Sequence, residues 1–547
     1  MRRSVFLLCL VALGQAACPA ARSGNLFTFR LNDGWGEVEW ISGSSFRWTR
    51  VWGRGPARRP PTKGERVKVT RKDLGDRWQF RTSYLVVEVA KKDLKFRVTD
   101  DEGKALAQTL AMRRAPQAVE LEFLADGTEQ FYGLGMRTAA SLNLRGQAIR
   151  AGKPFLISSL GYGEYYRGAG EYVFDLGQSQ ADRRTVKVPD GREVEYYFYY
   201  GPSPKEILEE HVALGAPGSD LDSEDFRILE AASVPGLVAR LPEGKGASWS
   251  GLRESIYALM HAGFSAMLAS AFDLGPYLRA DQELRERAAQ LATVAPVVWT
   301  SRAAALRNSS TFLKRTVDLR KRLTPFLVVY AQEARERGFP IVRPLAMQYH
   351  SDSETWKWTD EFLLGDELLV APVCEPGGRR SVYFPRGVWT DLRSNRVYKS
   401  RETVEIQAAP DELPVFGRNG SIVPLAPLAE SDPMELHYFP KLAAEFFVLE
   451  EDLSDYTLLH AAPAVEVVRL EIESLKDRDY EWVVHHTGPC RRVAQVDGPE
   501  YREAKSLAEL KPGWWFYDRA TDNLHVRVHA RAGQDHVVNL WLEVVWN

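Results

Sequence analysis

Cysteine is scarce in this chain, with four residues among 547, and two of the four, Cys9 and Cys18, lie close to the N-terminus. A fold that depends on a disulfide framework needs a denser and paired cysteine pattern, so that class of protein is excluded. The remaining Cys374 and Cys490 leave two alternatives, which are one structural disulfide or two buried free thiols.

An excess of charge of either sign is also missing, because 71 Lys and Arg residues oppose 73 Asp and Glu residues and leave a net charge of −2. A dedicated nucleic-acid-binding protein usually carries a strong basic excess, so we expect no nucleic-acid partner. Apolar residues at 45% and charged residues at 26% are typical of globular protein. At roughly 100–200 residues per domain, the length predicts three to five domains.

Long apolar runs are absent beyond the N-terminus. There, Arg2 and Arg3 precede the mostly apolar residues 5–13, and small residues follow at Gly14 and Ala16. A membrane-spanning helix needs about 20 apolar residues, so this shorter pattern predicts a secretory signal peptide over residues 1–23. We expect an exported protein with no transmembrane segment. Lipid attachment at Cys18 is the less favoured alternative.

Sequence motifs for nucleotides, flavins and nucleophilic serines are missing too. The chain has no Walker loop, no Gly-x-Gly-x-x-Gly, no nucleophile elbow and no Cys-x-x-Cys pair, so no cofactor is expected. His525 and His529 lie two alternations apart on an expected strand and therefore face one side. They are either a metal-ligand pair or surface histidines, and we expect the latter and no metal.

Short β-branched and aromatic runs dominate most of the chain. Residues 24–203 contain such runs, among them 85–89, 95–98 and 196–200, separated by turn signals, and predict a large antiparallel β-sandwich. Residues 345–430 and 431–547 are also rich in strand patterns, and we expect a β-sandwich domain in each.

Residues 204–344 differ, because amphipathic helical patterns alternate with short apolar runs. Helical spacing marks residues 204–214, 251–263, 282–294 and 311–338, the last interrupted at Thr324-Pro325. The apolar runs between the helices include 227–229 and 341–342. Strands that alternate with helices favour βα units and a parallel sheet.

Local motifs along the whole chain resemble glycoside hydrolase family 31, the α-glucosidase and α-xylosidase family. The motifs that carry the resemblance are Phe131-Tyr132-Gly133-Leu134-Gly135, residues 153–163, residues 200–208, residues 352–373 with Phe362-Leu363-Leu364-Gly365-Asp366, residues 418–424 and residues 447–452. The resemblance implies an N-terminal galactose-mutarotase-like sandwich, a (β/α)₈ barrel and two C-terminal β-sandwiches.

The barrel region is too short for that fold. A (β/α)₈ barrel takes about 250 residues, and roughly 200 at the low end, whereas residues 204–343 provide only about 140. About ten residues, 216–225, stand where the family has its first several βα units, including the strand that ends in the nucleophile Asp. Asp220, Asp222 and Asp225 lie in this polar replacement, which we interpret as a solvated linker. We therefore predict an incomplete barrel.

The second catalytic position is changed as well. Residues 226–229 resemble the strand before the family's acid/base loop, and Ser248-Trp249-Ser250-Gly251-Leu252-Arg253 resembles the helix after it. Between them the family has a Gly-Asp-Asn segment, whose Asp is the acid/base, and this chain has Gly244-Lys245-Gly246. A lysine at position 245 has no carboxyl proton to donate, and its charge is unfavourable beside an oxocarbenium-like transition state.

Two residues remain as candidate substrate-binding positions. Asp273 matches a polar pocket residue that follows a family strand. Trp299 and Ser301 stand where the family supplies an Arg and a sugar-binding His. We expect Asp273 and Trp299 to bind carbohydrate, and we expect no catalytic residue of the family's type.

Three functions stay open at this stage. The first is a degenerate, non-hydrolytic member of the family that is exported and retains carbohydrate binding. The second is an active α-glycosidase that uses non-standard carboxylates such as Glu230 and Asp273. The third is an interaction or scaffold protein unrelated to sugars. An incomplete barrel also leaves open strand edges, so we expect the sandwich, a helix, a second copy or another protein to cover them.

Overall fold

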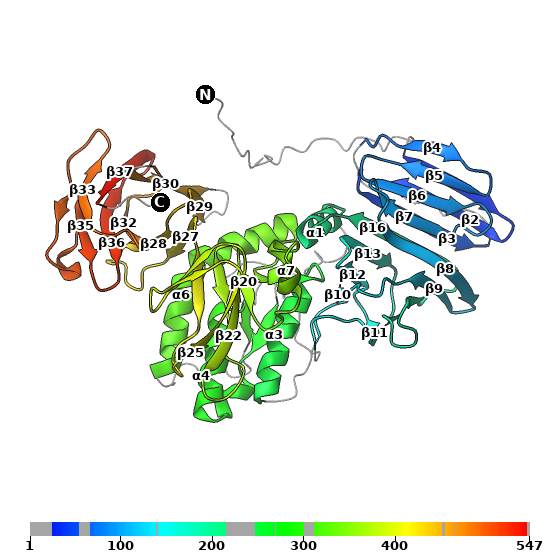
Figure 1. Cartoon of the computed structure of the whole chain (residues 1–547), viewed down its shortest axis with the longest axis horizontal. Coiled ribbons are helices and arrows are strands. Elements are labelled where there is room, and N and C mark those ends of the chain that lie inside the picture. The colour runs from blue at the N-terminus through cyan, green and yellow to red at the C-terminus, as the bar shows by residue number, and fades with distance from the viewer. Residues whose placement is uncertain are drawn as a thin grey trace.

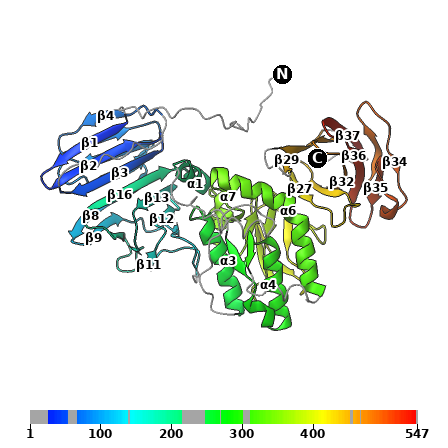
Figure 2. The ribbon, with the colours of Figure 1, turned by 180° about the vertical axis from the view of Figure 1, so that it is seen from behind.

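A computed structural model describes residues 25–53, 66–137, 141–214, 247–267, 270–299, 311–450, 455–464 and 467–543. Over these residues the chain is mostly β, with several sheets and a small group of helices between them (Figures 1 and 2). Among these residues, every helix is too short or too polar to cross a membrane. The predicted signal peptide and Cys18 lie outside the described residues.

Two sheets form an N-terminal sandwich, as the alternating patterns predict. One has the order β1 (Leu26–Leu31), β2 (Gly34–Trp40), β3 (Ser45–Trp52), β16 (Glu193–Tyr200), β13 (Tyr162–Arg167), β12 (Phe155–Ser158) and β10 (Phe131–Gly133). The other has the order β11 (Ala148–Ala151), β14 (Tyr172–Asp175), β15 (Arg183–Val188), β9 (Ala118–Leu124), β8 (Ala105–Ala115), β7 (Phe96–Asp100), β6 (Leu85–Ala90), β5 (Arg77–Arg81) and β4 (Thr70–Asp73). Neighbouring strands in both sheets are antiparallel.

Strand β16 has aromatic side chains on both faces of its sheet. Tyr196 and Phe198 lie in the core between the two sheets, whereas Tyr197 and Tyr199 face away and pack in the cluster that contains Ile207 of α1 (Pro204–Ala213). Helix α1 starts at a Ser203 cap whose hydroxyl accepts from the N–H of Glu206. The five consecutive aromatic residues at the end of β16, from Tyr196 to Tyr200, therefore join the sandwich to the helical region.

The helical region contains α3 (Trp249–Gly263), β17 (Ala271–Asp273), a 3₁₀ turn (Pro276–Arg279), α4 (Gln282–Val294), β18 (Val297–Trp299) and α6 (Thr311–Arg337). Strands β17 and β18 pair in parallel, as βα units predict. The expected run 227–229 lies outside the described residues.

The apolar run at 341–342 does not join this parallel pair, contrary to our expectation. It leads into β19 (Val342–Pro344), which pairs antiparallel with β20 (Phe362–Leu364) of the C-terminal region. Arg343 explains why β19 pairs with β20. Its fully buried guanidinium contacts Asp366 in the turn that follows β20. An apolar run of two residues cannot show which sheet it will join.

Helix α6 continues through Pro325, where the sequence predicts a break. A proline inside a helix removes one backbone hydrogen bond and usually kinks or ends the helix. Here Leu323, Phe326 and Leu327, on both sides of the proline, are buried in one core. Tertiary packing thus holds together the two halves of a helix that its local sequence would divide.

Four sheets make up the C-terminal region. The first joins β19 and β20 to β21 (Leu368–Val370), β26 (Val415–Arg418), β23 (Val388–Asp391) and β24 (Val397–Lys399), and the second pairs β22 (Arg379–Phe384) with β25 (Glu402–Gln407). The third has β27 (Ser421–Leu425), β28 (Met434–Phe439), β32 (Arg478–His485), β36 (Asn523–Ala530), β35 (Trp514–Asp518) and β34 (Arg502–Glu503). The fourth has β29 (Ala444–Leu449), β30 (Tyr456–Pro463), β31 (Val467–Ser474), β37 (Gln534–Leu542) and β33 (Cys490–Gln495).

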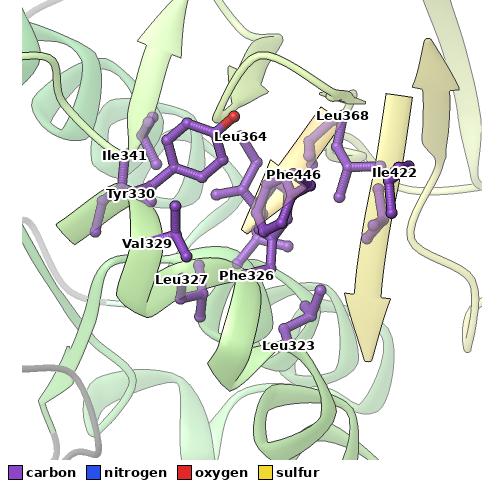
Figure 3. Close-up of a cluster of buried hydrophobic side chains, with 14 of the residues drawn as sticks. Leu323, Phe326, Leu327, Val329, Tyr330, Ile341, Leu364, Leu368, Ile422 and Phe446 are labelled. Atoms are coloured by element: carbon purple, nitrogen blue, oxygen red, sulfur yellow. The ribbon is translucent and has the colours of Figure 1, made fainter. Parts of the chain in front are cut away.

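Helix α6 packs against α4 on one side and against β27 and β29 on the other. Figure 3 shows the contact, in which the rings of Phe326 and Phe446 stack with centroids 5.7 Å apart and planes 6° apart. One continuous hydrophobic cluster therefore runs from the helices into the C-terminal sheets.

Candidate functional site

The two parallel strands place Asp273 beside Trp299, the two residues that we predict to bind substrate. They are register partners, and each is the last residue of its strand. In α/β barrels, side chains at the carboxyl ends of strands form the active site. The backbone thus brings together two predicted positions that are 26 residues apart in the chain.

The carboxylate of Asp273 is half-buried, and its Oδ1 accepts a hydrogen bond of 2.9 Å from the N–H of Gly275. This contact orients the carboxylate over the start of the turn that contains Tyr277. Tyr277 is buried against Phe272, with ring centroids 5.6 Å apart, and burial raises the pKa of its hydroxyl. Asp273 can accept hydrogen bonds from a ligand through its other oxygen.

The other residues of the predicted site lie outside the described part of the chain. This applies to Lys245 and Glu230, to the three aspartates between positions 220 and 225, and to the side chain of Trp299. The predicted replacement of the acid/base therefore stays a prediction.

The motif after the acid/base loop has a structural role where it is described. Ser248 caps α3, since its Oγ accepts from the N–H of Gly251 at 3.0 Å. Arg253, one turn later, donates to Glu375 at 2.6 Å and lies 3.9 Å from Asp360. These contacts attach α3 to the C-terminal sheets.

Residues Gly365 and Asp366, in the family's most recognisable motif, also anchor elements. Lys205 of α1 and Arg343 of β19 donate to Oδ1 of Asp366 at 2.8 and 2.5 Å. Burial alone would raise the pKa of Asp366, but these two cations hold it below its usual range. Gly365 has φ +61°, and an added Cβ would lie 2.2 Å from the ring of Tyr330. The ion pairs of Asp366 and the close packing of Gly365 therefore explain this motif. The sequence alone does not reveal this structural role.

The sandwich core contains a charge network that the sequence analysis missed. Arg184 and Glu164 are fully buried and paired, with one hydrogen bond of 2.8 Å. The hydroxyl of Tyr196 donates to the same carboxylate at 2.8 Å, and the guanidinium lies 4.1 Å from the ring centroid of Phe123. The signal in the sequence is limited to a tyrosine-rich strand that follows the pair Arg183-Arg184. Because the network is completely buried, its role is structural.

The histidines on β36 share one face, as the alternation predicts. His525 contacts Glu481 at 2.9 Å and His529 contacts Asp479 at 2.7 Å, both on the neighbouring strand β32. Within the described ranges, no group of three or more His, Cys, Asp or Glu residues could hold a metal ion. Cys374 and Cys490 are both buried and free, which decides between the two alternatives for them.

A cavity of about 360 Å³ opens on the sandwich over β5, β6 and β7. A second cavity, of about 340 Å³, lies between the β13–β14 and β15–β16 turns. Both are lined mainly by polar and charged residues, in contrast to the apolar lining of most small-molecule sites.

Comparison with known proteins identifies the family. Residues 26–175 match the N-terminal galactose mutarotase-like domain of glycosyl hydrolase family 31, and residues 338–423 match the C-terminal domain of the same family. The GH31 dextranase of Flavobacterium johnsoniae, in complex with glucose, has a TM-score of 0.78 at 17% identity and covers 94% of this chain and 98% of that chain. That structural likeness establishes the fold.

Two curated relatives match part of the chain. Alpha-glucosidase 2 of Bacillus thermoamyloliquefaciens is 30% identical over 197 residues, which are 34% of this chain and 25% of that protein. SITS-binding protein of Tetronarce californica is 32% identical over 203 residues, which are 35% of this chain and 29% of that protein. The matches thus span less than a third of each relative. The chain belongs to glycoside hydrolase family 31.

Proposed function

We propose that this chain is an exported member of glycoside hydrolase family 31 that binds carbohydrate without hydrolysing it. The observation that carries the proposal is the pair at the ends of β17 and β18, where one strand supplies a carboxylate, Asp273, and its neighbour supplies Trp299. A retaining glycosidase needs two carboxyl groups about 5–5.5 Å apart, and an inverting one needs them about 6.5–9.5 Å apart.

The sequence supports the same conclusion at the acid/base position. Lys245 replaces the expected Asp, and its ammonium group cannot protonate a leaving oxygen as a carboxylic acid does. A carboxylate beside an aromatic residue still suits sugar binding, because Asp273 can accept from hydroxyl groups and an indole such as that of Trp299 can stack on C–H faces.

The domain plan belongs to this proposal. It comprises a signal peptide (1–23), a sandwich (24–203), an incomplete barrel (204–344) and two β domains (345–430 and 431–547). We infer that the open edges of the barrel pair with other elements, a second copy or another protein, since exposed strand edges promote association. We expect no nucleic-acid partner, because the charge is balanced.

An active α-glycosidase is the second candidate. It is favoured by the place of Asp273 at the carboxyl end of a parallel strand and by the names of the relatives, which include a glucosidase and a dextranase. In that case Glu230 would be the partner of Asp273. A non-sugar binding role is the third, and the name of one relative, SITS-binding protein, favours it.

Turnover of aryl α-glucoside, α-xyloside and α-galactoside by the purified mature protein tests the first two candidates. We expect no release of the aryl group above the blank, because one carboxylate cannot act as both nucleophile and acid. Lys245→Ala runs beside the wild type as the contamination control, and turnover that neither this variant nor Asp273→Asn nor Glu230→Gln changes would belong to a contaminating glycosidase.

Turnover that Asp273→Asn or Glu230→Gln abolishes would refute the proposal and establish the second candidate. A loss of at least 10³-fold is expected in that case, as for the removal of a catalytic carboxylate or base. Binding of the same sugars without turnover would distinguish the first candidate from the third.

A further inference from the structure

We propose that the chain has a second saccharide site, on the outer face of the nine-stranded sheet, in the cavity over β5, β6 and β7. The site deepens the proposed function and rests on it, because it gives carbohydrate binding a place away from the shortened barrel. In Figures 1 and 2, β10 and β12 lie next to the helices, and β4 and β5 lie at the opposite side of the sandwich.

A row of planar polar side chains crosses this face. Gln79, Glu88 and Arg97 are direct register partners on β5, β6 and β7. Their neighbours along each strand, such as Phe80 and Val87, point into the sandwich core, so the row faces outward. The amide of Gln79 donates to Glu88 at 3.1 Å, which holds both side chains in place. The row offers an amide, a carboxylate and a guanidinium to one ligand.

The next row contributes the one apolar side chain of the cavity lining, Val86. Val86 is 8% exposed and lies between its register partners Arg81 and Thr99. The turn at residues 100–103 forms one wall of the cavity, and it is fixed because Oδ1 of Asp100 accepts from the N–H of Lys104 at 2.8 Å. A sugar ring has apolar C–H groups on its faces and hydroxyl groups at its edge, so Val86 can contact a ring face while the surrounding polar side chains bind the hydroxyl groups.

The charge of the lining selects among saccharides. Two arginines, at positions 81 and 97, oppose four carboxylates, at positions 88, 100, 101 and 102. This excess of negative charge disfavours uronate, sulfated and phosphorylated sugars. A neutral ligand gains hydrogen bonds to ionised partners, which are stronger than bonds between neutral groups. The volume of about 360 Å³ lies at the lower end of the range for small-molecule sites, roughly 300–1,000 Å³, and suits a short segment of a neutral glycan.

The test is isothermal titration of the full mature protein with maltoheptaose and with a short dextran, supported by affinity electrophoresis in gels containing the same glucans. Glu88→Ala and Arg97→Ala should each weaken binding at least tenfold. Arg97 is exposed, and Glu88 is partly exposed on the outer face with bonds, among the described residues, only to Gln79 and Arg77, so the variants should keep a melting temperature close to that of the wild type. Glu120→Ala is the matched control, because Glu120 is a half-exposed carboxylate on β9 of the same sheet, and it should bind as the wild type does.

The outcomes separate this inference from the proposed function. Binding that survives Glu88→Ala and Arg97→Ala but is lost in Asp273→Asn would overturn the second site and leave the proposed function intact. Failure of the wild type to bind either glucan would overturn both. Equal losses in Glu120→Ala and Glu88→Ala would also overturn the site, because the effect would then be one of surface charge alone.

Discussion

Individual residues in this chain have ionisation states that differ from those in water, and Glu361 is the clearest case. Its carboxyl group is fully buried, and burial raises its pKa to about 8, although Arg380 lies 3.5 Å away. The N–H of Tyr383 donates to the carboxyl group at 3.2 Å, a bond that the neutral acid also accepts. Burial therefore favours the protonated form of Glu361 at pH values where an exposed glutamate is ionised.

This burial makes stability depend on pH. In the unfolded chain a glutamic acid loses its proton near pH 4.5, whereas folded Glu361 keeps it until about pH 8. Between these values the folded state binds more protons, so the free energy of unfolding contributed by this group falls as pH rises. We expect Glu361→Gln to flatten the decline of the melting temperature between pH 5 and pH 8.

Differential scanning fluorimetry across that range measures the effect. A change of ~1 kcal/mol corresponds to about 2–4 °C for a domain of 150–250 residues. Glu405→Gln is the control, because that side chain is mostly exposed, and it should leave the pH profile unchanged. Parallel profiles for the wild type and Glu361→Gln would contradict the assignment.

At the scale of elements, helix α6 depends on packing more than on its own sequence. It continues through Pro325 because its apolar side chains are buried against β27 and β29. Phe446 of β29 is 5% exposed and stacks on Phe326 of the helix. Removal of this ring leaves a cavity that the neighbours fill only in part.

We expect Phe446→Ala to lower the free energy of unfolding by ~3–5 kcal/mol. Phe447→Ala, at the next position and only half-buried, should cost clearly less. Urea denaturation followed by tryptophan fluorescence compares the two. Equal costs would mean that the contact with α6 contributes little.

The sequence predicts some elements well and others poorly, for physical reasons. Strands such as β6 and β16 follow from β-branched or aromatic residues with turn signals at their ends. The adjacency of Asp273 and Trp299 follows from βα alternation. The pairing of β19 and the continuity of α6 do not follow, because both depend on side chains far away in the sequence, Asp366 and Phe446. The network around Arg184 is hidden for the same reason.

On the scale of the whole molecule, the described residues form three hydrophobic clusters of unequal size, the smallest of which lies between the first and second C-terminal sheets, around Trp389 and Phe416. One contains residues of the sandwich alone, from Val38 to Phe198. The largest combines the helices, the first, third and fourth C-terminal sheets and the outward-facing residues of the sandwich sheet that contains β16, such as Tyr197 and Tyr199. The sandwich therefore has a core of its own between its two sheets, whereas the helical region shares its core with the C-terminal sheets and with one outer face of the sandwich.

This division predicts how fragments behave. We expect residues 24–203 to fold alone with a cooperative thermal transition, although Tyr197 and Tyr199 lose their cover from α1. We expect residues 204–430 to bind a hydrophobic dye and to melt without cooperativity, because they lack Phe446 and its neighbours. Circular dichroism and dye fluorescence on both fragments test this expectation. A cooperative transition of fragment 204–430 would contradict it.

The shared core also bears on how the chain could change over time. In a closed barrel every strand hydrogen-bonds to two others, so the loss of one strand exposes two neighbours. Helix α6 instead receives support from β27 and β29, outside the parallel strands. A chain with this arrangement can keep α6 folded when a neighbouring parallel strand is lost, so the C-terminal sheets give the helical region tolerance to deletion as well as stability.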